Sequence, residues 1–262
     1  MYIITLSYCG KRYHGWQIQN NANTVQAELH KALFRIFKKN TPHPAGCSRT
    51  DTAVHALHYV ATVSKIRDIP PENLKRGLNS LLPTDIRVKN IEVQDGFVDA
   101  RRLVFGKHYR YLVFADRVIS PFMHDLMWHS AYPLDVSAMQ QATHHFVGKH
   151  DFATFQASGT DITYTVRSIY HTSVTQVGQY ILLDWVGDGF LKHQVRTMSG
   201  LLVAVGRGKI SPDDVPAIIE AKNRDAAAET LPGKGLYLHT LFRKDGEAEM
   251  YTPPKSFQEM VW

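Results

Sequence analysis

A chain of 262 residues is long enough to bury a substantial core, as one large domain or as two smaller ones. Its hydrophobic content of 44% and charged content of 21% are typical of a soluble globular protein. No run approaches the roughly 18 consecutive apolar residues of a membrane span, and the first residues lack the order of a signal peptide, so we expect no membrane segment and a cytoplasmic location. Lys and Arg outnumber Asp and Glu by 30 to 24, which permits a polyanionic partner without proving one.

The two cysteines, Cys9 and Cys47, exclude a disulfide framework and a zinc ribbon. Neither cysteine has a partner at metal-ligand spacing. We therefore expect two reduced thiols.

The chain opens with a predicted strand, residues 2 to 8, and a glycine-punctuated loop, residues 9 to 17, that holds basic and aromatic side chains together. Such a loop suits RNA, because bases stack on aromatic rings and phosphates meet Lys or Arg. Aromatic residues packed under a loop would give the same pattern. Lys11 and Arg12 are the candidate phosphate contacts of this loop.

An amphipathic helix is predicted to begin after Thr24, a suitable N-cap, because apolar residues recur at three- and four-residue steps as far as Phe37. Residues 40 to 48 are expected to lead as an irregular strand into a polar loop. Residues 59 to 63 then return as the next strand.

A second helix is predicted to open at Pro70 and to end at Pro83, and residues 86 to 93 complete the first half as a strand. The order strand, helix, strand, strand, helix, strand is the ferredoxin-like pattern.

The second half repeats this order of elements with insertions. Its expected strands and helices span residues 107–114, 135–147, 166–176, 180–187, 191–205, 212–221 and 236–242. We therefore predict an α+β fold of two ferredoxin-like (βαββαβ) halves, residues 1–104 and 105–243, followed by a mobile tail at residues 244–262. We expect the two sheets to join side by side, with a catalytic cleft between the halves.

A polar, charged segment, residues 46 to 56, lies between two apolar, strand-like runs, and Asp51 is its candidate chemical centre. A loop rich in Ser, Thr, Arg, Asp and His beside a strand presents a carboxylate on a rigid edge. The same composition is also typical of a polar turn whose side chains bond to their own backbone.

Residues 188 to 196 lead from a glycine turn into a helix with an apolar stripe. Lys192, Arg196 and Ser199 are expected about a quarter turn away, facing a groove or solvent. A helix N-terminus with Lys and Arg nearby favours an anion, either a phosphate or the Asp51 carboxylate. A solvated basic face is the alternative interpretation.

The central segment reads Arg49-Thr50-Asp51-x-x-Val54-His55-Ala56, which resembles the signature of the tRNA pseudouridine synthase A (TruA) family, whose loop carries the catalytic aspartate. Ser48 and Ala53 depart from it, since both replace glycines of the family pattern. The backbone turn can differ at these positions, and a Cβ at a positive φ costs free energy.

Further motifs resemble the same family in the right order from about residue 2 to residue 242. The loop at residues 9–17 is similar to the family's opening motif, with Cys9 in place of Asp. The resemblance implies that Arg196 pairs with the catalytic carboxylate, although Gln194 replaces the Met of that motif. It implies that Tyr109 contacts the target base and that Leu236 lines the uracil pocket.

The implied activity is isomerisation of uridine to pseudouridine in tRNA, without cofactor or metal. Asp51 would act as a nucleophile at the ribose C1′ or as a base that withdraws a ribose proton, and both routes stay open. Tyr109 would stack on the uracil and take part in removing the C5 proton. Arg49 would fill the space of the flipped base. Lys11, Arg12 and Lys192 would contact the phosphates of the RNA.

By the same resemblance, the target would be uridines at positions 38–40, in the anticodon stem-loop, and the enzyme a homodimer. Two rival functions belong to other classes. One is a metal-dependent phosphoesterase in which Asp51 and His55, four residues apart, share a metal. The other is a non-catalytic RNA-binding module of ferredoxin-like fold, in which Asp51 only caps a turn.

Overall fold

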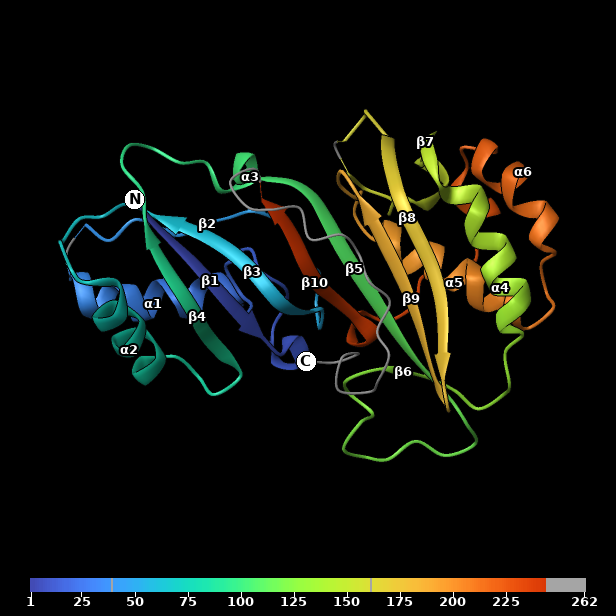
Figure 1. The fold of residues 1–262 in the computed structure, drawn as a ribbon, viewed down its shortest axis with the longest axis horizontal. Helices are drawn as coiled ribbons and strands as arrows, with labels where there is room; N and C mark the ends of the chain where they lie inside the picture. Colours follow the sequence, from blue (N-terminus) through green and yellow to red (C-terminus); the bar gives the residue numbers. More distant parts are fainter. Residues whose placement is uncertain (39, 161, 244–262) are drawn as a thin grey trace. The chain divides into compact units, whose positions relative to one another are not determined.

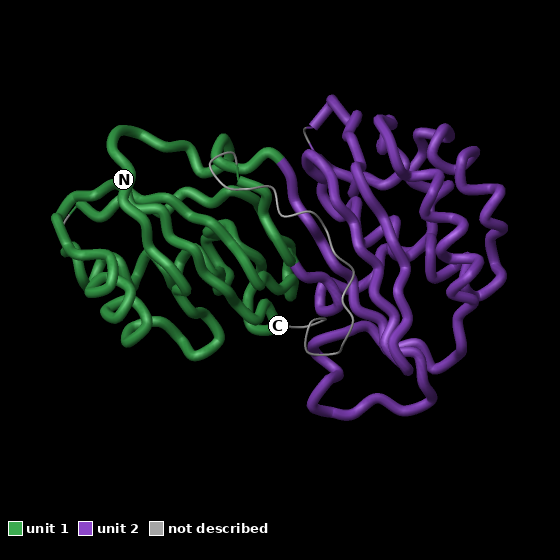
Figure 2. The backbone as a smooth tube through the Cα atoms, viewed as in Figure 1, with its two compact units in different colours: residues 1–105, 238–249 green, residues 106–237, 250–262 purple. Residues whose placement is uncertain are grey.

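The computed structural model describes residues 1–38, 40–160 and 162–243, and its chain divides into two compact units (Figure 2). Among the described residues, unit 1 comprises residues 1–105 and 238–243, and unit 2 comprises residues 106–237. Strands and helices occur in both, so the fold is α+β, as predicted (Figure 1). The segment predicted as a mobile tail, residues 244–262, lies outside the described residues.

Unit 1 is an antiparallel sheet with helices. Strand β1 lies between β3 and β4 and runs antiparallel to both, while β10 follows β3 in the sheet order. The elements are β1 Tyr2–Tyr8, the 3₁₀ helix η1 Gly10–Arg12, α1 Val25–Phe37, β2 Ala45–Gly46, β3 His55–Val63, α2 Pro71–Leu81, β4 Ile86–Val93, α3 Ala100–Leu103 and β10 Leu236–Arg243, of which residues 238–243 belong to this unit.

Local chemistry accounts for the first helix. The Thr24 hydroxyl accepts a hydrogen bond from the Ala27 N–H at 3.4 Å, which satisfies one of the free donors at the start of α1. The apolar stripe of α1 is buried, and the ring of Phe37 stacks on that of Tyr2. The predicted helix is therefore confirmed.

The predicted irregular strand at residues 40–48 is wrong for most of its length. Only β2, Ala45–Gly46, pairs with β3. Pro42 and Pro44 have no N–H to donate to a sheet ladder, which explains why pairing begins after them.

Unit 2 is also built on an antiparallel sheet, in the order β5-β9-β8-β7, with β6 parallel to β5. Helix α4 packs against α5 and β8. Its strands and helices are β5 Val104–Ala115, which begins in unit 1, β6 Trp128–Ser130, α4 Val136–Thr143, β7 Gly148–Asp151, β8 Val166–Val177, β9 Tyr180–Gly187, α5 Gln194–Gly206 and α6 Val215–Glu220. The 3₁₀ helices are η2 His144–Phe146, η3 Ala153–Phe155, η4 Pro212–Asp214, η5 Arg224–Ala226 and η6 Gly233–Gly235.

Helix α5 differs from its prediction in two respects. It starts at residue 194 instead of 191, because His193 has a φ of 64° and so interrupts the helical backbone. Ser199, expected to face a groove or solvent, is fully buried and accepts a hydrogen bond from the Trp185 indole at 3.1 Å. The polar face of this helix therefore ends before Ser199.

The described residues contain no candidate membrane-spanning helix. None of their helices combines the length and the apolar character needed to cross a bilayer.

Candidate active site

The loop that carries Asp51 connects β2 to β3 within unit 1. Its first residue, Cys47, still donates to Val60 of β3 at 3.0 Å, and its last turn closes through a 3.2 Å bond from the Val54 N–H to the Asp51 carbonyl. Along the loop, Arg49 is exposed, Thr50 is buried and Asp51 is half-buried. The carboxylate is thus close to the protein interior while its neighbour Arg49 reaches solvent.

Three aromatic side chains support this loop, two through hydrogen bonds and one through ring stacking. The Tyr59 hydroxyl donates to the Ser48 carbonyl, and the Tyr8 hydroxyl shares a 2.9 Å hydrogen bond with the Thr50 hydroxyl. Trp16 stacks on Tyr59 with ring centroids 4.2 Å apart. Because these bonds reach the residues on both sides of Arg49, they fix the backbone that leads into Asp51.

The loop at residues 9–17 is seated directly on the Asp51 loop. The Trp16 N–H donates to the Thr50 carbonyl at 3.2 Å, and the Ala53 N–H donates to the Tyr13 carbonyl at 3.1 Å. At Gly15, whose φ is +84°, a Cβ atom would lie 2.2 Å from the Thr50 carbonyl oxygen, so the close approach requires glycine. The aromatic residues of this loop are therefore packing residues of the site, which favours the structural explanation of that pattern.

The two departures from the family signature behave differently. Ala53 has a φ of 63°, so it occupies the left-handed region that the glycine of the family pattern adopts without strain. Ser48 is not among the described residues with a positive φ. The predicted conformational cost therefore falls on Ala53 alone.

Arg12 and Lys11, the candidate phosphate contacts, are both exposed on η1. Arg12 pairs with Asp85 at 2.7 Å, and the Tyr13 hydroxyl donates to the same carboxylate at 2.6 Å. Burial alone would raise the pKa of Asp85, but these two hydrogen bonds outweigh it and lower that pKa. Arg12 thus has a structural role in fixing the loop at residues 9–17.

Tyr109 lies on β5 of unit 2 and is almost fully buried. Its ring meets the edge of Phe190 at a centroid distance of 5.4 Å and an interplanar angle of 90°. Phe190 belongs to the Gly-Asp-Gly-Phe turn that precedes α5. This turn therefore packs against β5 at Tyr109.

The N-terminal turn of α5 has its own internal support. The side chain of Gln194, which replaces a methionine of the family motif, is fully buried. Its oxygen accepts a hydrogen bond from the Leu191 N–H at 2.8 Å, and its amide contacts the Met198 sulfur at 3.8 Å. Gln194 therefore satisfies a backbone donor that a methionine would leave to another partner. Lys192, nearby, is exposed.

Arg196, two residues further along α5, is hydrogen-bonded to the segment before β10. Its Nε donates to the Leu231 carbonyl at 2.7 Å, and the Leu231 N–H donates back to the Arg196 carbonyl at 3.3 Å. The Tyr111 hydroxyl donates to Pro232 of the same segment at 2.8 Å. Burial raises the pKa of Tyr111, while the charge of Arg196 opposes that rise. Leu236, which follows this segment, is buried at the start of β10.

A buried charge cluster on β5 and β9 was not predicted from the sequence. The Asp184 carboxylate accepts hydrogen bonds from His108 at 2.6 Å and from Arg110 at 2.8 and 3.3 Å. Burial alone would raise the pKa of Asp184, but the His108 hydrogen bond and the Arg110 charge outweigh it and hold that pKa well below its usual range. Arg110 and Asp184 are cross-strand neighbours, as are Tyr109 and Trp185. Because side chains alternate along a strand, the cluster lies on the opposite face of the sheet from Tyr109.

The predicted site residues divide between the units. Unit 1 holds the Asp51 loop with Arg49, Lys11 and Arg12, and unit 2 brings Tyr109, Arg196 and Leu236 into one folded body with Lys192. The phosphoesterase alternative needs Asp51 and His55 four residues apart on a helix. The structure does not favour it, because Asp51 lies in a loop and His55, at the start of β3, accepts a hydrogen bond from the Gly10 N–H at 3.1 Å. Over the described ranges, no group of three or more His, Cys, Asp or Glu residues is arranged to hold a metal.

Comparison with known proteins gives one consistent result. The family model described as tRNA pseudouridine synthase matches residues 4–101 and 142–242. The tRNA pseudouridine synthase A of Bacillus velezensis is 42% identical over 89% of this chain and 95% of its own. The Bacillus subtilis enzyme is 40% identical over 91% and 97%, and that of Moorella thermoacetica is 42% identical over 90% and 96%. The chain therefore belongs to the tRNA pseudouridine synthase family.

Proposed function

We propose that the chain isomerises uridine to pseudouridine in tRNA, with Asp51 as the central catalytic residue. The observation that carries this proposal is the Asp51 loop itself. Its signature residues belong to the segment matched by the family model, and buried hydroxyls and backbone bonds hold it from both sides. The non-catalytic alternative is not favoured, because the relatives over nearly the whole chain are synthases.

The reaction breaks the N1–C1′ bond of uridine and forms a C5–C1′ bond. N1 gains a proton and C5 loses one, so the isomerisation needs neither oxidant nor reductant. The Asp51 carboxylate acts either by attacking C1′ or by withdrawing a ribose proton, and either route divides one difficult step into easier ones. The half-buried position of Asp51 suits both, because the carboxylate reaches the substrate while its backbone is fixed.

The remaining roles follow from the family motifs. Arg196 is proposed to pair with the Asp51 carboxylate, since an opposite charge in contact stabilises a carboxylate once substrate has excluded water. Tyr109, supported by Phe190, is proposed to stack on the uracil and to take part in moving the C5 proton. Leu236 is proposed to line the uracil pocket.

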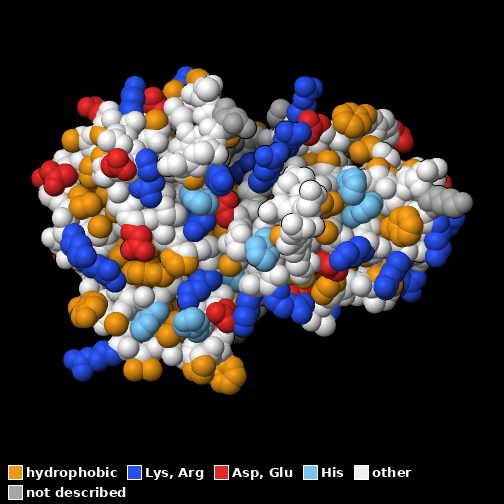
Figure 3. Space-filling model, turned by 180° about the vertical axis from the view of Figure 1, so that it is seen from behind, with side chains coloured by type: hydrophobic (Ala, Val, Ile, Leu, Met, Phe, Trp, Pro, Cys, Tyr) orange, Lys and Arg blue, Asp and Glu red, His pale blue; other side chains and the backbone are white. Residues whose placement is uncertain are grey.

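The target uridine must leave its stack before Asp51 reaches the sugar, at a cost of a few kcal/mol. Arg49, which is exposed, is proposed to fill the vacated space. Lys11, Arg12 and Lys192 are proposed to contact phosphates, and the net charge of +6 supports a polyanionic substrate. Lys and Arg side chains project from many points of the face shown in Figure 3.

Finer aspects of the proposal rest on the family alone. They are action on uridines 38–40 of the anticodon stem-loop, assembly as a homodimer, independence of metals and cofactors, and a cytoplasmic location. The division of the chain into halves, residues 1–104 and 105–243, is proposed on a different ground, the repeated order of predicted elements.

Tritium release from tRNA labelled at uridine C5 tests the proposal, because pseudouridine formation sends that hydrogen to water. With a chelator present, the wild type is expected to release tritium, and Asp51→Asn is expected to lose at least about 1,000-fold in rate. The control is Asp95→Asn, an exposed carboxylate outside the site, which should match the wild type. If the wild type binds tRNA and releases no tritium, the enzyme assignment is wrong.

A further inference from the structure

Unit 2 contains a surface pocket of about 440 Å³ whose lining includes none of the proposed catalytic residues. Its walls come from β7, β8 and the turn before α5. The lining includes Lys149, Tyr164, Arg167, Ser168, Asp188 and Gly189.

The two cations of the pocket have no carboxylate at ion-pair distance within the described part of the chain. Arg167 instead donates from Nη1 to the carbonyls of Tyr164 at 3.0 Å and Val166 at 2.6 Å. Those bonds occupy one nitrogen and orient the guanidinium at the pocket wall. Lys149 is exposed on β7. Two cations that make no ion pair with a described carboxylate favour an anion from outside.

The acidic residue of the pocket is engaged elsewhere. The Asp188 carboxylate accepts a hydrogen bond from the Ser168 N–H at 3.1 Å, and the Asp188 N–H donates to the Ser168 carbonyl at 3.0 Å. These bonds connect the turn before α5 to β8. The pocket therefore keeps one net positive charge, and its carboxylate is directed to the backbone.

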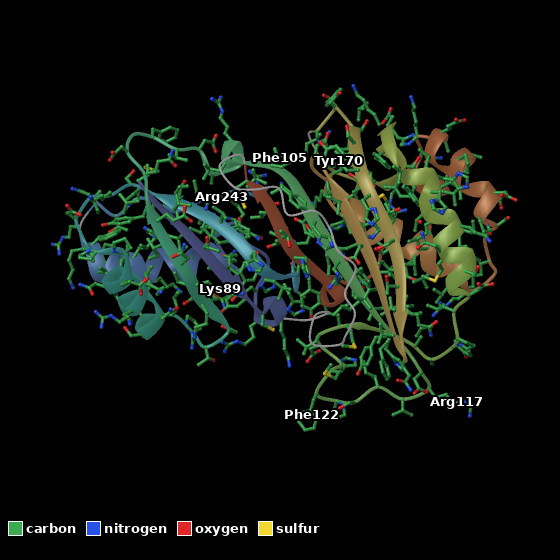
Figure 4. All side chains as sticks on the ribbon, in the orientation of Figure 1. Lys89, Phe105, Arg117, Phe122, Tyr170 and Arg243 are labelled. Carbon is green, nitrogen blue, oxygen red and sulfur yellow. The ribbon has the colours of Figure 1, made fainter. Side chains whose placement is uncertain are left out.

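An aromatic ring stands beside the cations. Tyr164 is 64% exposed, although a tyrosine ring ordinarily loses free energy by remaining in water, and the Arg167 guanidinium lies 6.0 Å from its centroid. Tyr170, on β8, is 54% exposed and is labelled in Figure 4. An exposed ring next to a cation, as at Tyr164, is a surface on which a nucleobase stacks while its phosphate is held.

The pocket is linked to the proposed base-binding residue through two adjacent residues of the turn before α5. Gly189 lines the pocket, and the next residue, Phe190, packs against the Tyr109 ring at 5.4 Å. RNA whose target uracil lies on Tyr109 thus has neighbouring nucleotides within reach of this pocket.

We propose that this pocket binds a nucleotide of the substrate tRNA other than the target uridine. Lys149 and Arg167 hold its phosphate, and its base stacks on Tyr164. The inference rests on the proposed function, since it names a second contact of the same substrate.

Steady-state tritium release with increasing tRNA concentration, and equilibrium binding of the same tRNA, test the pocket. Lys149→Ala and Tyr164→Ala are the variants of choice, because both side chains are exposed and neither anchors the fold. Arg167 is left intact because it holds residues 164 and 166 in place. The matched controls are Lys209→Ala and Tyr132→Ala, which are also exposed side chains of unit 2. Lys209 follows the far end of α5, a 13-residue helix about 20 Å long.

Tyr164→Ala is expected to raise KM and Kd by about 5-fold or more, with kcat within about two-fold of the wild type. Lys149→Ala is expected to weaken binding by about 3-fold or more at low salt and to reduce the slope of log Kd against log salt by just under 1. Both controls should match the wild type.

Two outcomes would overturn the inference about the pocket, and a third would overturn the proposed function on which it rests. If Lys149→Ala and Tyr164→Ala match their controls while the wild type releases tritium, the pocket is not a tRNA site and the proposed function stands. If these variants lower kcat and leave KM unchanged, the pocket is not a binding subsite. If the wild type releases no tritium, the proposed function itself falls.

Discussion

Two aspartates, Asp51 and Asp184, lie in contrasting surroundings. Asp184 is fully buried on β9, with His108 and Arg110 bonded to it, and its pKa is held far below the usual range. Asp51 is half-buried in a loop that neutral hydroxyls and backbone bonds support. Our proposal gives the chemistry to Asp51. Under it, the strongly perturbed buried carboxylate has a structural role, and the carboxylate proposed to react is only half-buried.

The largest effect on stability is expected from Asp184→Asn. The change removes the charge that compensates buried Arg110, so the free energy of unfolding should fall by about 3–5 kcal/mol. Urea unfolding followed by circular dichroism measures this difference. Asp95→Asn, at an exposed position, should change it by less than about 0.5 kcal/mol. A loss below about 1 kcal/mol for Asp184→Asn would show that the cluster is not held by charge.

The pH dependence of stability tests the same role of the Asp184 charge. Because folding lowers the pKa of Asp184, its contribution is fully present above the unfolded value of about 4 and declines as pH falls toward the folded value. The stability difference between the wild type and Asp184→Asn should therefore shrink below about pH 4. A difference that stays constant between pH 7 and pH 3 would argue that the variant acts through packing.

An intermediate effect is expected from Tyr59→Phe, which removes the hydroxyl bonded to Ser48 while keeping the ring under Trp16. Leaving the partly buried Ser48 carbonyl without that donor should cost about 1–2 kcal/mol of stability. Because the bond positions the backbone before Asp51, kcat should fall about 10-fold with KM little changed. Tritium release at saturating tRNA measures the effect.

Tyr2→Phe is the matched control for this change. Its hydroxyl is also bonded to backbone carbonyls, those of Arg67 and Ile69, and its ring is equally buried in unit 1. It should lose similar stability with kcat unchanged. Equal losses of kcat in both variants would mean that activity follows stability and not the position of the loop.

The smallest effect is expected from Ala53→Gly. Removing a Cβ at a φ of 63° relieves strain, and this gain exceeds the entropy that glycine adds to the unfolded chain, so stability should rise by up to about 1 kcal/mol. Ala228→Gly, at a position without positive φ, should instead lose about 0.4–1 kcal/mol. Thermal unfolding of both variants measures whether stability rises or falls. A loss of stability for Ala53→Gly would contradict the strain assigned to Ala53.

Periodic signals in the sequence predicted the fold elements well. The Thr24 cap and the stripe ending at Phe37 predicted α1, and residues 86–93, predicted as a strand, form β4. At Ser199 the prediction was wrong because the deciding contact is made by another element. Ser199 looks like a polar surface position on a helical wheel, yet it bonds to Trp185 on a neighbouring strand.

The site was predictable only in part for the same reason. Asp51 stands out because its polar loop interrupts apolar strands, and its proposed role follows from the resemblance to the family motif. Tyr8, Trp16 and Tyr59 read in sequence as ordinary aromatic residues, because their support of the loop depends on pairing between β1 and β3. Asp184 reads as one polar residue in an apolar strand, and only the cross-strand register reveals Arg110 as its partner.

The seating of residues 9–17 on the Asp51 loop has a consequence for how the site opens. The Trp16 amide is bonded to Thr50 and the Ala53 amide to Tyr13, so neither loop can leave without breaking the bonds of the other. These amides should therefore exchange with deuterium together, at one shared rate set by a joint opening event. Although neither segment is regular secondary structure, the pair forms a single cooperative unit, and a protease that cuts one loop should cut only molecules in which both are released.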